Sequence, residues 1–254
     1  MKHIQKRSEP AELTTWKHRY RKWKNKDQVW NKFQKKTEVR DLVKNSLLEE
    51  QFYLCCYCEQ SLEGEYGEIE APLETEEEIE NSPEAEEEVE VYGDAQPNDS
   101  SNTTGEGKPE KSHIEHFQPR KDSAVDPLNY DNLLCSCLKD WPPSVPLHCG
   151  ALKANWFDPS LLISPLDPTC ESRFAYSALG DIIPADKDDL AAATTIEKLG
   201  LNIPKLREMR AEAVAPFGDE SLSSEELQIL VDDYLQDKNG KLNRFWTTIK
   251  SLYA

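Results

Sequence analysis

Long apolar stretches are missing from this sequence. Across its 254 residues, no hydrophobic run approaches the roughly 20 residues that an α-helix needs to cross a bilayer. The amino terminus also lacks the continuous apolar segment of a secretory signal. No internal repeat and no Gly-x-x-x-x-Gly-Lys-Ser/Thr phosphate loop are present. We therefore expect a cytoplasmic protein, and any dependence on ATP has to come from another chain.

Basic charge is scarce overall, but its distribution is uneven. The net charge is −18, and residues 63–110 account for most of it, with 18 Asp and Glu against the single Lys108. Residues 1–48 instead carry 14 Lys and Arg against five acids, a net charge of +9. This is the sign needed near phosphate groups. The acidic total therefore does not exclude a nucleic-acid-binding protein.

The acidic segment at residues 63–110 combines like charges with Gly, Pro, Ser and Asn, as in "ETEEEIENSPEAEEEVE". Such a composition cannot bury enough apolar surface to fold, so we predict an acidic disordered insertion. It is either a solvated loop between two strands or a phosphate mimic that covers the active site or a basic groove.

Residues 1–50 are predicted to form a basic amphipathic helical region. Apolar side chains recur at spacings of three, four and seven, which predicts one amphipathic helix over 13–33; they are Leu13, Trp16, Tyr20, Trp23, Trp30 and Phe33. A second helix is expected around residues 37–51. The basic face is either solvated or contacts nucleic acid or a partner, with Arg120 and Lys121 as further contacts; its residues are Lys17, Arg19, Arg21, Lys22 and Lys24.

Residues 159–254 are predicted to form a hairpin followed by helices. Gly180 and Asp181 separate two short segments rich in β-branched and aromatic residues, which is typical of a hairpin turn. Ser223 and Ser224 before Glu225 and Glu226 are a helix-capping signal, and Gly240 interrupts the later helical pattern.

Seven cysteines, an odd number in short-spaced groups, indicate metal binding in a reducing compartment. Cys55 and Cys58 have the Cys-x-x-Cys spacing of a zinc knuckle, and Cys137 and Cys149 would complete a tetrahedral site. Four thiolates select zinc and leave no open position, so the ion would be structural. Cys56 and Cys135 are then buried small residues or spare thiols, and Cys170 has no assigned role. The alternative is that all seven are buried free cysteines.

The segment "SHIEHFQPRK" lies between the two halves of the cysteine site. In a strand, His113 and Glu115 face one way and His116 the other. Glu115 offers hard oxygen ligands for a divalent ion, and His116 can take a proton from an attacking water. This pair suits phosphodiester hydrolysis, although two histidines alone are more often structural.

These motifs resemble the HNH endonucleases, which share a hairpin plus helix around one divalent metal, often with a four-cysteine zinc site. The resemblance rests on Cys55-x-x-Cys58, "EHFQP" at 115–119, Asn132 in "YDNLLCSC", and "HCGALK" ending at Lys153. More narrowly, these segments and "ISPLDPTCESRFAY" are similar to the PtuB-like nuclease subunits of Septu and retron antiphage systems. The similarity covers most of residues 10–210 apart from the insertion. Phe117 departs from the motif, which usually has an aliphatic residue there.

The resemblance implies that His116 is the general base, that Glu115 binds a catalytic Mg²⁺ or Mn²⁺, and that Asn132 supports the loop over the histidine strand. Many HNH sequences place a second metal ligand, Asn or His, directly after the last cysteine, but this chain has Gly150 there. The alternatives for that ligand are His148, Asn155 and His113, and Lys153 is a further candidate. The eleven residues between the third and fourth cysteines also exceed the usual two, and we expect this loop to cross the mouth of the site.

The expected fold is therefore α+β, with a ββα-metal (HNH) core and structural zinc site at residues 51–62 and 111–158, surrounded by helices. The resemblance also implies partners: an ABC/SMC-like (PtuA-like) ATPase and, in some systems, a retron reverse transcriptase with its RNA–DNA hybrid. Phage DNA and tRNA are both suitable substrates. The rival hypothesis is a non-catalytic zinc-knuckle subunit that binds nucleic acid or acts as an adaptor, for which Gly150 is the main argument. A self-contained restriction enzyme would need activity without any ATPase.

Overall fold

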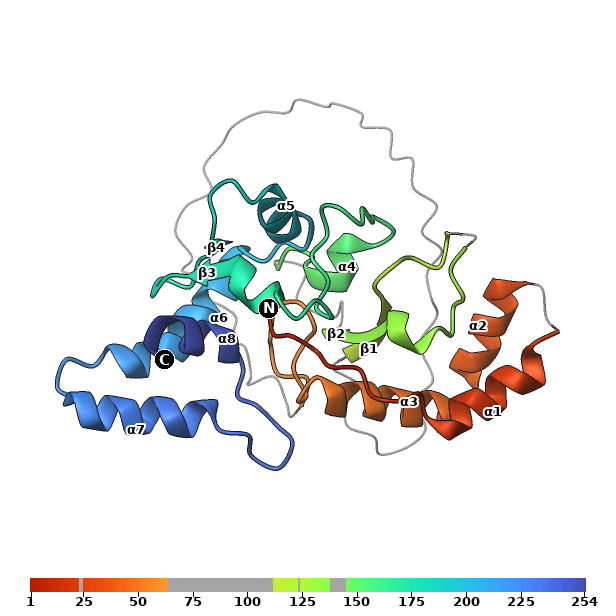
Figure 1. The fold of residues 1–254 in the computed structure, drawn as a ribbon, viewed down its shortest axis with the longest axis horizontal. Helices are drawn as coiled ribbons and strands as arrows, with labels where there is room; N and C mark the ends of the chain where they lie inside the picture. Colours follow the sequence, from red (N-terminus) through yellow and green to blue (C-terminus); the bar gives the residue numbers. More distant parts are fainter. Residues whose placement is uncertain (23–24, 64–111, 123, 138–144) are drawn as a thin grey trace, which may run out of the picture. The chain divides into compact units, whose positions relative to one another are not determined.

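The computed structural model describes residues 1–22, 25–63, 112–122, 124–137 and 145–254 (Figure 1). This part of the chain combines helices with two small two-stranded sheets, as an α+β sequence predicts. The expected acidic insertion, apart from Glu63, lies outside the described residues, as does most of the loop that follows Cys137.

The amino-terminal region forms α1 (Ala11–Tyr20), α2 (Lys26–Lys35) and α3 (Thr37–Glu50). The prediction of one continuous helix over 13–33 was therefore wrong, whereas the helix expected around 37–51 is confirmed. The cause is local, because the side chain of Asn25 accepts a hydrogen bond from the backbone of Gln28 and so caps a new helix at α2.

The break allows the apolar stripe to fold back on itself. Trp16 of α1 meets Phe33 of α2 edge to face, with ring centroids 5.8 Å apart. Leu13, Trp16, Trp30 and Phe33 are all buried. These four members of the stripe therefore pack inward, whereas Trp23 lies outside the described residues. Both helices also contact α3 (Figure 1).

The first sheet pairs β1 (Ser112–His116) with β2 (Leu133–Cys137) in antiparallel register, with Glu115 opposite Leu134. A short 3₁₀ turn, η1 (Tyr130–Asn132), leads into β2, and the five-residue α4 (Cys149–Lys153) contacts β2. The order is thus strand, strand, helix.

Buried Gln51 connects α3, the knuckle at 51–62 and β2. Its amide nitrogen donates to the carbonyls of Leu54 and Cys135, each at 2.8 Å, and its side-chain oxygen accepts from the Cys135 backbone at 2.7 Å. Because every polar atom of this amide is used, the knuckle is held at a fixed place beside the sheet.

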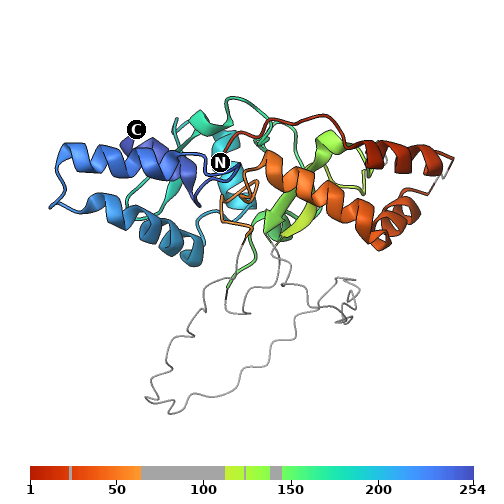
Figure 2. The same ribbon diagram turned by 90° about the horizontal axis from the view of Figure 1, so that it is seen from below.

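The carboxy-terminal region begins with η2 (Cys170–Arg173) and a hairpin of β3 (Phe174–Tyr176) and β4 (Ile182–Pro184). The predicted turn is confirmed, and Gly180 occupies it with a φ of +82° that glycine adopts without strain. The helices that follow are α5 (Leu190–Lys198), α6 (Pro204–Val214), η3 (Ala215–Gly218), α7 (Ser224–Leu235) and α8 (Trp246–Tyr253) (Figure 2).

The cap expected at Ser223 is also confirmed. Its hydroxyl accepts from the backbone of Glu226, whose carboxylate accepts from the Ser223 backbone in return, which makes a capping box at α7. Gly240, with a φ of +78°, lies in the connection between α7 and α8. None of the helices in the described part is long and apolar enough to span a membrane.

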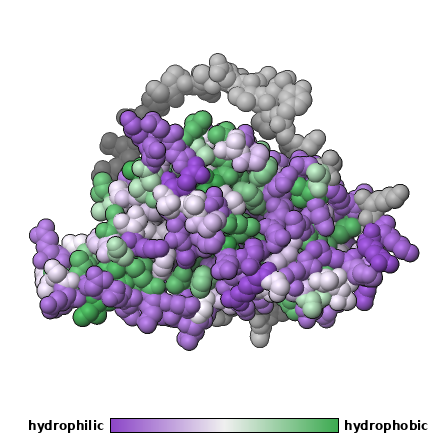
Figure 3. All heavy atoms as spheres, in the orientation of Figure 1, coloured by the Kyte–Doolittle hydropathy of each residue, from purple (hydrophilic) through white to green (hydrophobic). Residues whose placement is uncertain are grey.

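One main hydrophobic cluster joins the amino-terminal helices, the first sheet and the hairpin, and a smaller one holds α7 and α8 around Val231 and Ile249. The face seen in Figure 3 is mostly hydrophilic, with apolar patches between the polar side chains. The buried carboxylate of Glu59 links the knuckle to α8, because it accepts a 2.8 Å hydrogen bond from the Thr247 backbone and pairs with the Met1 amino group, also at 2.8 Å.

Candidate metal centre and active site

The structure brings together the four cysteines that the sequence singled out. Cys55 and Cys58 come from the knuckle, Cys137 ends β2, and Cys149 begins α4. Their sulfur atoms all lie within 4.8 Å of one another, and all four residues are buried. The Sγ atoms of Cys55 and Cys137 are 3.7 Å apart. In a tetrahedral zinc site with bonds of about 2.3 Å, sulfurs lie roughly 3.8 Å apart, so the donor set fits zinc.

The knuckle has the backbone expected of a metal-binding turn. The Cys55 amide donates a hydrogen bond to the Gln60 carbonyl at 2.8 Å, and the Glu59 amide donates one to the Cys55 carbonyl at 3.1 Å. Glu59 adopts a left-handed φ of +61° that closes this turn. The turn points Cys55 and Cys58 toward the same place as Cys137 and Cys149.

The thiols of the cluster influence one another's ionisation. Burial alone raises the pKa of the Cys55 thiol, but hydrogen bonds from the other thiols of the cluster outweigh it and hold that pKa well below its usual value. Burial and hydrogen bonds with the other thiols of the cluster raise the pKa of Cys149 well above the ordinary range. A bound dication would stabilise the thiolate form of these cysteines.

The three remaining cysteines stand apart from this cluster, and all are buried. Burial raises the pKa of Cys135 to about 12 and that of Cys170 to about 12, and it raises the pKa of Cys56 well above its usual value. Their thiols therefore stay protonated and unreactive near neutral pH. Of the two interpretations of Cys56 and Cys135, the structure favours buried small residues.

Glu115 lies on the inner face of β1 and is 7% exposed. Its Oε2 lies 3.3 Å from His113 Nε2, as the alternation of a strand predicts. Its Oε1 lies 2.9 Å from the ammonium of Lys153 and accepts a 3.3 Å hydrogen bond from the Tyr57 hydroxyl. Burial opposes ionisation, but His113 and Lys153 together lower the pKa of Glu115, so the carboxyl is charged.

Two of these partners come directly from the cysteine cluster. Tyr57 lies between Cys55 and Cys58 in the knuckle, and Lys153 is in the short helix that begins at Cys149. Whatever fixes the cysteines therefore also fixes the groups that hold Glu115.

His116 ends β1 and is 9% exposed. Its Nε2 lies 2.9 Å from the carbonyl oxygen of Pro127, and its ring packs edge to face on Trp30 with centroids 4.5 Å apart. Because a carbonyl only accepts, Nε2 carries the hydrogen and Nδ1 of the neutral ring keeps a lone pair. Burial lowers the pKa of His116 to about 4, which keeps the imidazole neutral at pH 7.

Asn132 holds the segment that leaves β1. Its Oδ1 accepts from the Gln118 backbone at 2.7 Å, and its Nδ2 donates to the Gln118 carbonyl at 2.9 Å. The Phe117 amide donates to the Asn132 carbonyl at 3.0 Å. This is the geometry of the loop-supporting role that the resemblance implies.

Gly150 packs directly against the acidic side chain. A Cβ atom at this position would lie 2.6 Å from Glu115 Oε2, which is closer than Cβ atoms approach in proteins, and would make a tight contact of 3.1 Å with His113 Nε2. Of the alternatives for the missing ligand, Asn155 lines the same pocket as Glu115, whereas His148 is buried and lies 3.2 Å from the Pro146 carbonyl through Nδ1.

Glu115 and His116 open onto one pocket of about 420 Å³, although their side chains leave the strand on opposite faces. Arg120, Lys121 and Asn155 line it as well. The Arg120 guanidinium lies 5.2 Å from the centre of the Trp30 ring and 3.3 Å from Asp27. The pocket therefore presents a carboxylate, a neutral imidazole and basic side chains together.

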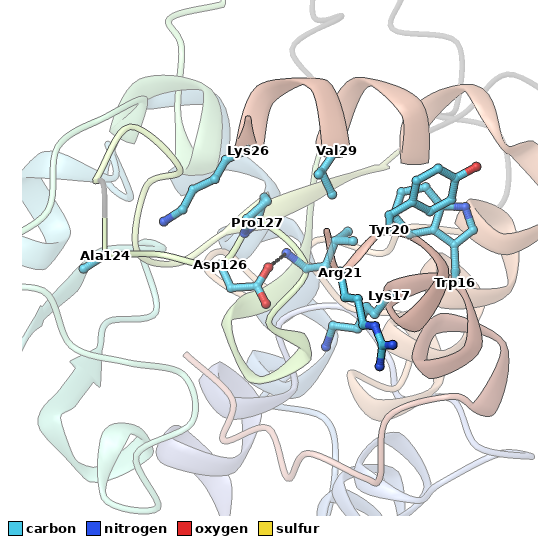
Figure 4. Close-up of a pocket in the computed structure, with 10 residues that line it drawn as sticks. Trp16, Lys17, Tyr20, Arg21, Lys26, Val29, Ala124, Asp126 and Pro127 are labelled. Atoms are coloured by element: carbon cyan, nitrogen blue, oxygen red, sulfur yellow. Dashed lines mark hydrogen bonds between the residues drawn. The ribbon is translucent and has the colours of Figure 1, made fainter. Parts of the chain in front are cut away.

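A second pocket, of about 280 Å³, lies between α1, α2 and residues 124–128 (Figure 4). Trp16 and Tyr20 line it beside Lys17 and Arg21, two of the predicted nucleic-acid contacts. Lys17 is ion-paired with Glu9, whereas Arg19 and Lys22 are exposed. Lys24 lies outside the described residues. Pro127, whose carbonyl orients His116, forms part of the wall of this second pocket.

Sequence reasoning missed Tyr57, Pro127 and the role of Trp30. Tyr57 stood inside the Cys-x-x-Cys motif, where its hydroxyl could have been noticed as a neighbour of the site. Trp30 gave only the signal of a core residue, and a backbone carbonyl such as that of Pro127 leaves no mark in a sequence.

No protein-family model matches this chain, and a comparison with curated proteins finds no match.

Proposed function

We propose that this protein is a metal-dependent endonuclease of the HNH type that hydrolyses phosphodiester bonds. The observation that carries the proposal is the joint placement of Glu115 and His116 at one pocket, each held by its own partners. The strand, strand, helix order of β1, β2 and α4 beside the cysteine cluster supports a ββα-metal core.

In the proposed reaction, His116 acts as the general base. Its Nε2–H donates to the Pro127 carbonyl, which fixes the tautomer and leaves Nδ1 to accept a proton from the attacking water. Trp30 restricts the ring orientation. Asn132 holds the backbone just after the histidine and so keeps the ring at the pocket.

Glu115 is the proposed ligand of the catalytic ion. A bound Mg²⁺ or Mn²⁺ would stabilise the charge that develops on the scissile phosphate and the leaving oxygen. Lys153 and Tyr57 both contact Oε1 of Glu115 and so fix the orientation of the carboxylate. Arg120 and Lys121, on the pocket wall, are placed to attract the phosphate backbone. The zinc of the four cysteines has a structural role.

The substrate and setting follow from the sequence resemblance. We propose phage DNA or tRNA as the substrate and an antiphage defence system as the context, with an ABC/SMC-like ATPase as partner. The basic residues of the amino-terminal helices, Arg19, Arg21 and Lys22 among them, are candidate contacts to nucleic acid or to that partner.

The test is a cleavage assay with the zinc-loaded protein, alone and with the ATPase, in Mg²⁺ or Mn²⁺. His116→Ala is expected to abolish cleavage while the zinc content and the circular dichroism spectrum stay unchanged. His3→Ala, which alters a half-buried histidine in the segment before α1, is the matched control and should cleave like the wild type. If the His116 variant cleaves at the wild-type rate, the proposed mechanism is wrong.

A non-catalytic binding or adaptor subunit is the second candidate function. The specific observation in its favour is that Lys153, Tyr57 and His113 already occupy both oxygens of Glu115. Nucleic-acid binding by the wild type, without cleavage under any combination of metal and partner, would support this alternative.

A further inference from the structure

The space that a side chain of residue 150 would fill lies next to two atoms of the kinds that bind metal ions. Glu115 Oε2 and His113 Nε2 are 3.3 Å apart, and a Cβ on Gly150 would lie 2.6 Å and 3.1 Å from them respectively. Both side chains leave the same face of β1. One point in space is thus within reach of a carboxylate oxygen and an imidazole nitrogen, and the helix leaves that point open because residue 150 has no side chain.

We propose that His113 and Glu115 together bind the catalytic divalent cation, and that α4 contributes the space at Gly150 and no ligand. This inference rests on the proposed function, in which the same ion serves phosphodiester hydrolysis. A chain with Gly after the last cysteine is then not a decayed enzyme. Its second protein ligand comes from the strand instead of the helix.

The distance between the two atoms suits a shared ion. Adjacent ligands of an octahedral ion with bonds of about 2.1 Å lie roughly 3.0 Å apart, close to the observed 3.3 Å. The approach of the two side chains needs no backbone change, because strand alternation already brings them to one side.

Of the groups that hold Glu115, only His113, the other proposed ligand, contacts Oε2. Lys153 and Tyr57 both contact Oε1, whereas Oε2 faces His113. The His113 side chain is 34% exposed, so one side of the point is open to water or phosphate oxygens. With only two protein ligands, the remaining positions are available to the substrate, as a nuclease site requires.

The mixed donor set also predicts which metal is preferred. Magnesium prefers all-oxygen surroundings, whereas imidazole suits transition metals. We therefore expect Mn²⁺ to bind more tightly than Mg²⁺.

The experiment is a Mn²⁺ titration of the zinc-loaded full chain, with free Mn²⁺ measured by electron paramagnetic resonance. A pulsed spectrum then shows whether an imidazole nitrogen is bound to the manganese. The wild type is expected to bind one Mn²⁺ with a nitrogen coupling. His113→Ala should weaken binding roughly tenfold or more and remove the coupling. His3→Ala, as the matched control, should bind like the wild type.

Two further variants distinguish the loss of a metal ligand from a folding defect. His113→Asp supplies an oxygen in place of the nitrogen, so Mn²⁺ binding should persist while the nitrogen coupling disappears. Gly150→Ala should weaken Mn²⁺ binding because its methyl group fills the proposed position, and the zinc count should stay at about one per chain. Unchanged Mn²⁺ affinity and coupling in His113→Ala would overturn the inference.

The outcome is separable from that of the proposed function. If the wild type binds Mn²⁺ through His113 and Glu115 but cleaves no nucleic acid, the metal site stands and the nuclease function fails. If the wild type cleaves and His113→Ala keeps both its Mn²⁺ affinity and its nitrogen signal, the nuclease function stands and the ligand assignment fails.

Discussion

The ammonium of Lys153 lies 2.9 Å from Glu115 Oε1 and 3.1 Å from the carbonyl oxygen of His116, and the side chain of Lys153 is completely buried. One cation therefore holds both members of the Glu115–His116 pair, through the side chain of the first and the backbone of the second. Lys153 comes from the helix that begins at a cysteine of the cluster. Glu115 and His116 are thus held in place by a helix that begins in the cysteine cluster.

Removing the ammonium group of Lys153 should lower the free energy of unfolding. Lys153→Met leaves the buried carboxylate of Glu115 without its positive partner, and we expect a loss of about 3–5 kcal/mol in unfolding free energy, measured by urea denaturation. Lys198→Met, which breaks the exposed pair with Glu197 at 3.1 Å, should cost at most about 1 kcal/mol. The double variant Lys153→Met with Glu115→Gln should recover part of the loss, and a single variant as stable as the wild type would contradict the account.

The cysteine cluster predicts one zinc ion per chain. Cys149→Ser should lose the zinc and unfold the knuckle, because a four-thiolate site contributes its binding free energy to folding. Cys135→Ser is the matched control, since it lies in the same strand as Cys137 but outside the cluster. Zinc content by atomic emission and far-ultraviolet circular dichroism distinguish the two. Retention of zinc by Cys149→Ser would show that the four thiols do not form one site.

The loop-supporting role of Asn132 is testable through its two hydrogen bonds to Gln118. Asn132→Ala removes both and should cost about 1–3 kcal/mol of stability, because it leaves the Gln118 backbone groups without partners. Asn132→Asp keeps the acceptor and loses the donor, so an intermediate loss is expected. Asn129→Ala removes one longer bond, 3.3 Å to the exposed Asp131 backbone, and should have a small effect. Equal losses for Asn132 and Asn129 variants would contradict this role.

The loss of stability at acidic pH should depend on Glu171. Burial alone would raise its pKa, but hydrogen bonds from Lys2 and the His3 backbone outweigh it and lower the pKa from 4.5 to about 2. A depressed pKa in the folded state stabilises the protein above pH 4.5, and that stability is lost as the pH falls from 4.5 toward 2. Glu171→Gln should remove this part of the pH dependence in urea titrations, whereas Glu197→Gln at an exposed site should not.

The parts of the site that follow local rules could be predicted from the sequence. The Cys-x-x-Cys spacing, strand alternation at His113 and Glu115, and the capping box at Ser223 each depend on residues a few positions apart. The structure agrees with all three. The apolar period does not reveal the break between α1 and α2, because it continues across the break, whereas the cap at Asn25 starts a new helix locally.

The rest depends on tertiary packing that no local pattern encodes. The apolar period marked Trp30 as a core residue, and it is buried, but only the docking of α2 places its ring on His116. Gly150 was counted against an active site because a ligand is expected there in sequence. In three dimensions its missing side chain is what allows Glu115 and His113 to approach the helix.

The four cysteines come from three segments that are far apart in the chain, so a bound zinc would act as a cross-link that closes loops. The entropic cost of closing a loop grows only with the logarithm of its length, by about 0.6 kcal/mol for each doubling. The acidic segment lies within the longest of these loops, between Cys58 and Cys137. Its length can therefore change greatly at little thermodynamic cost, which leaves that position of the chain open to insertions while the metal centre stays closed.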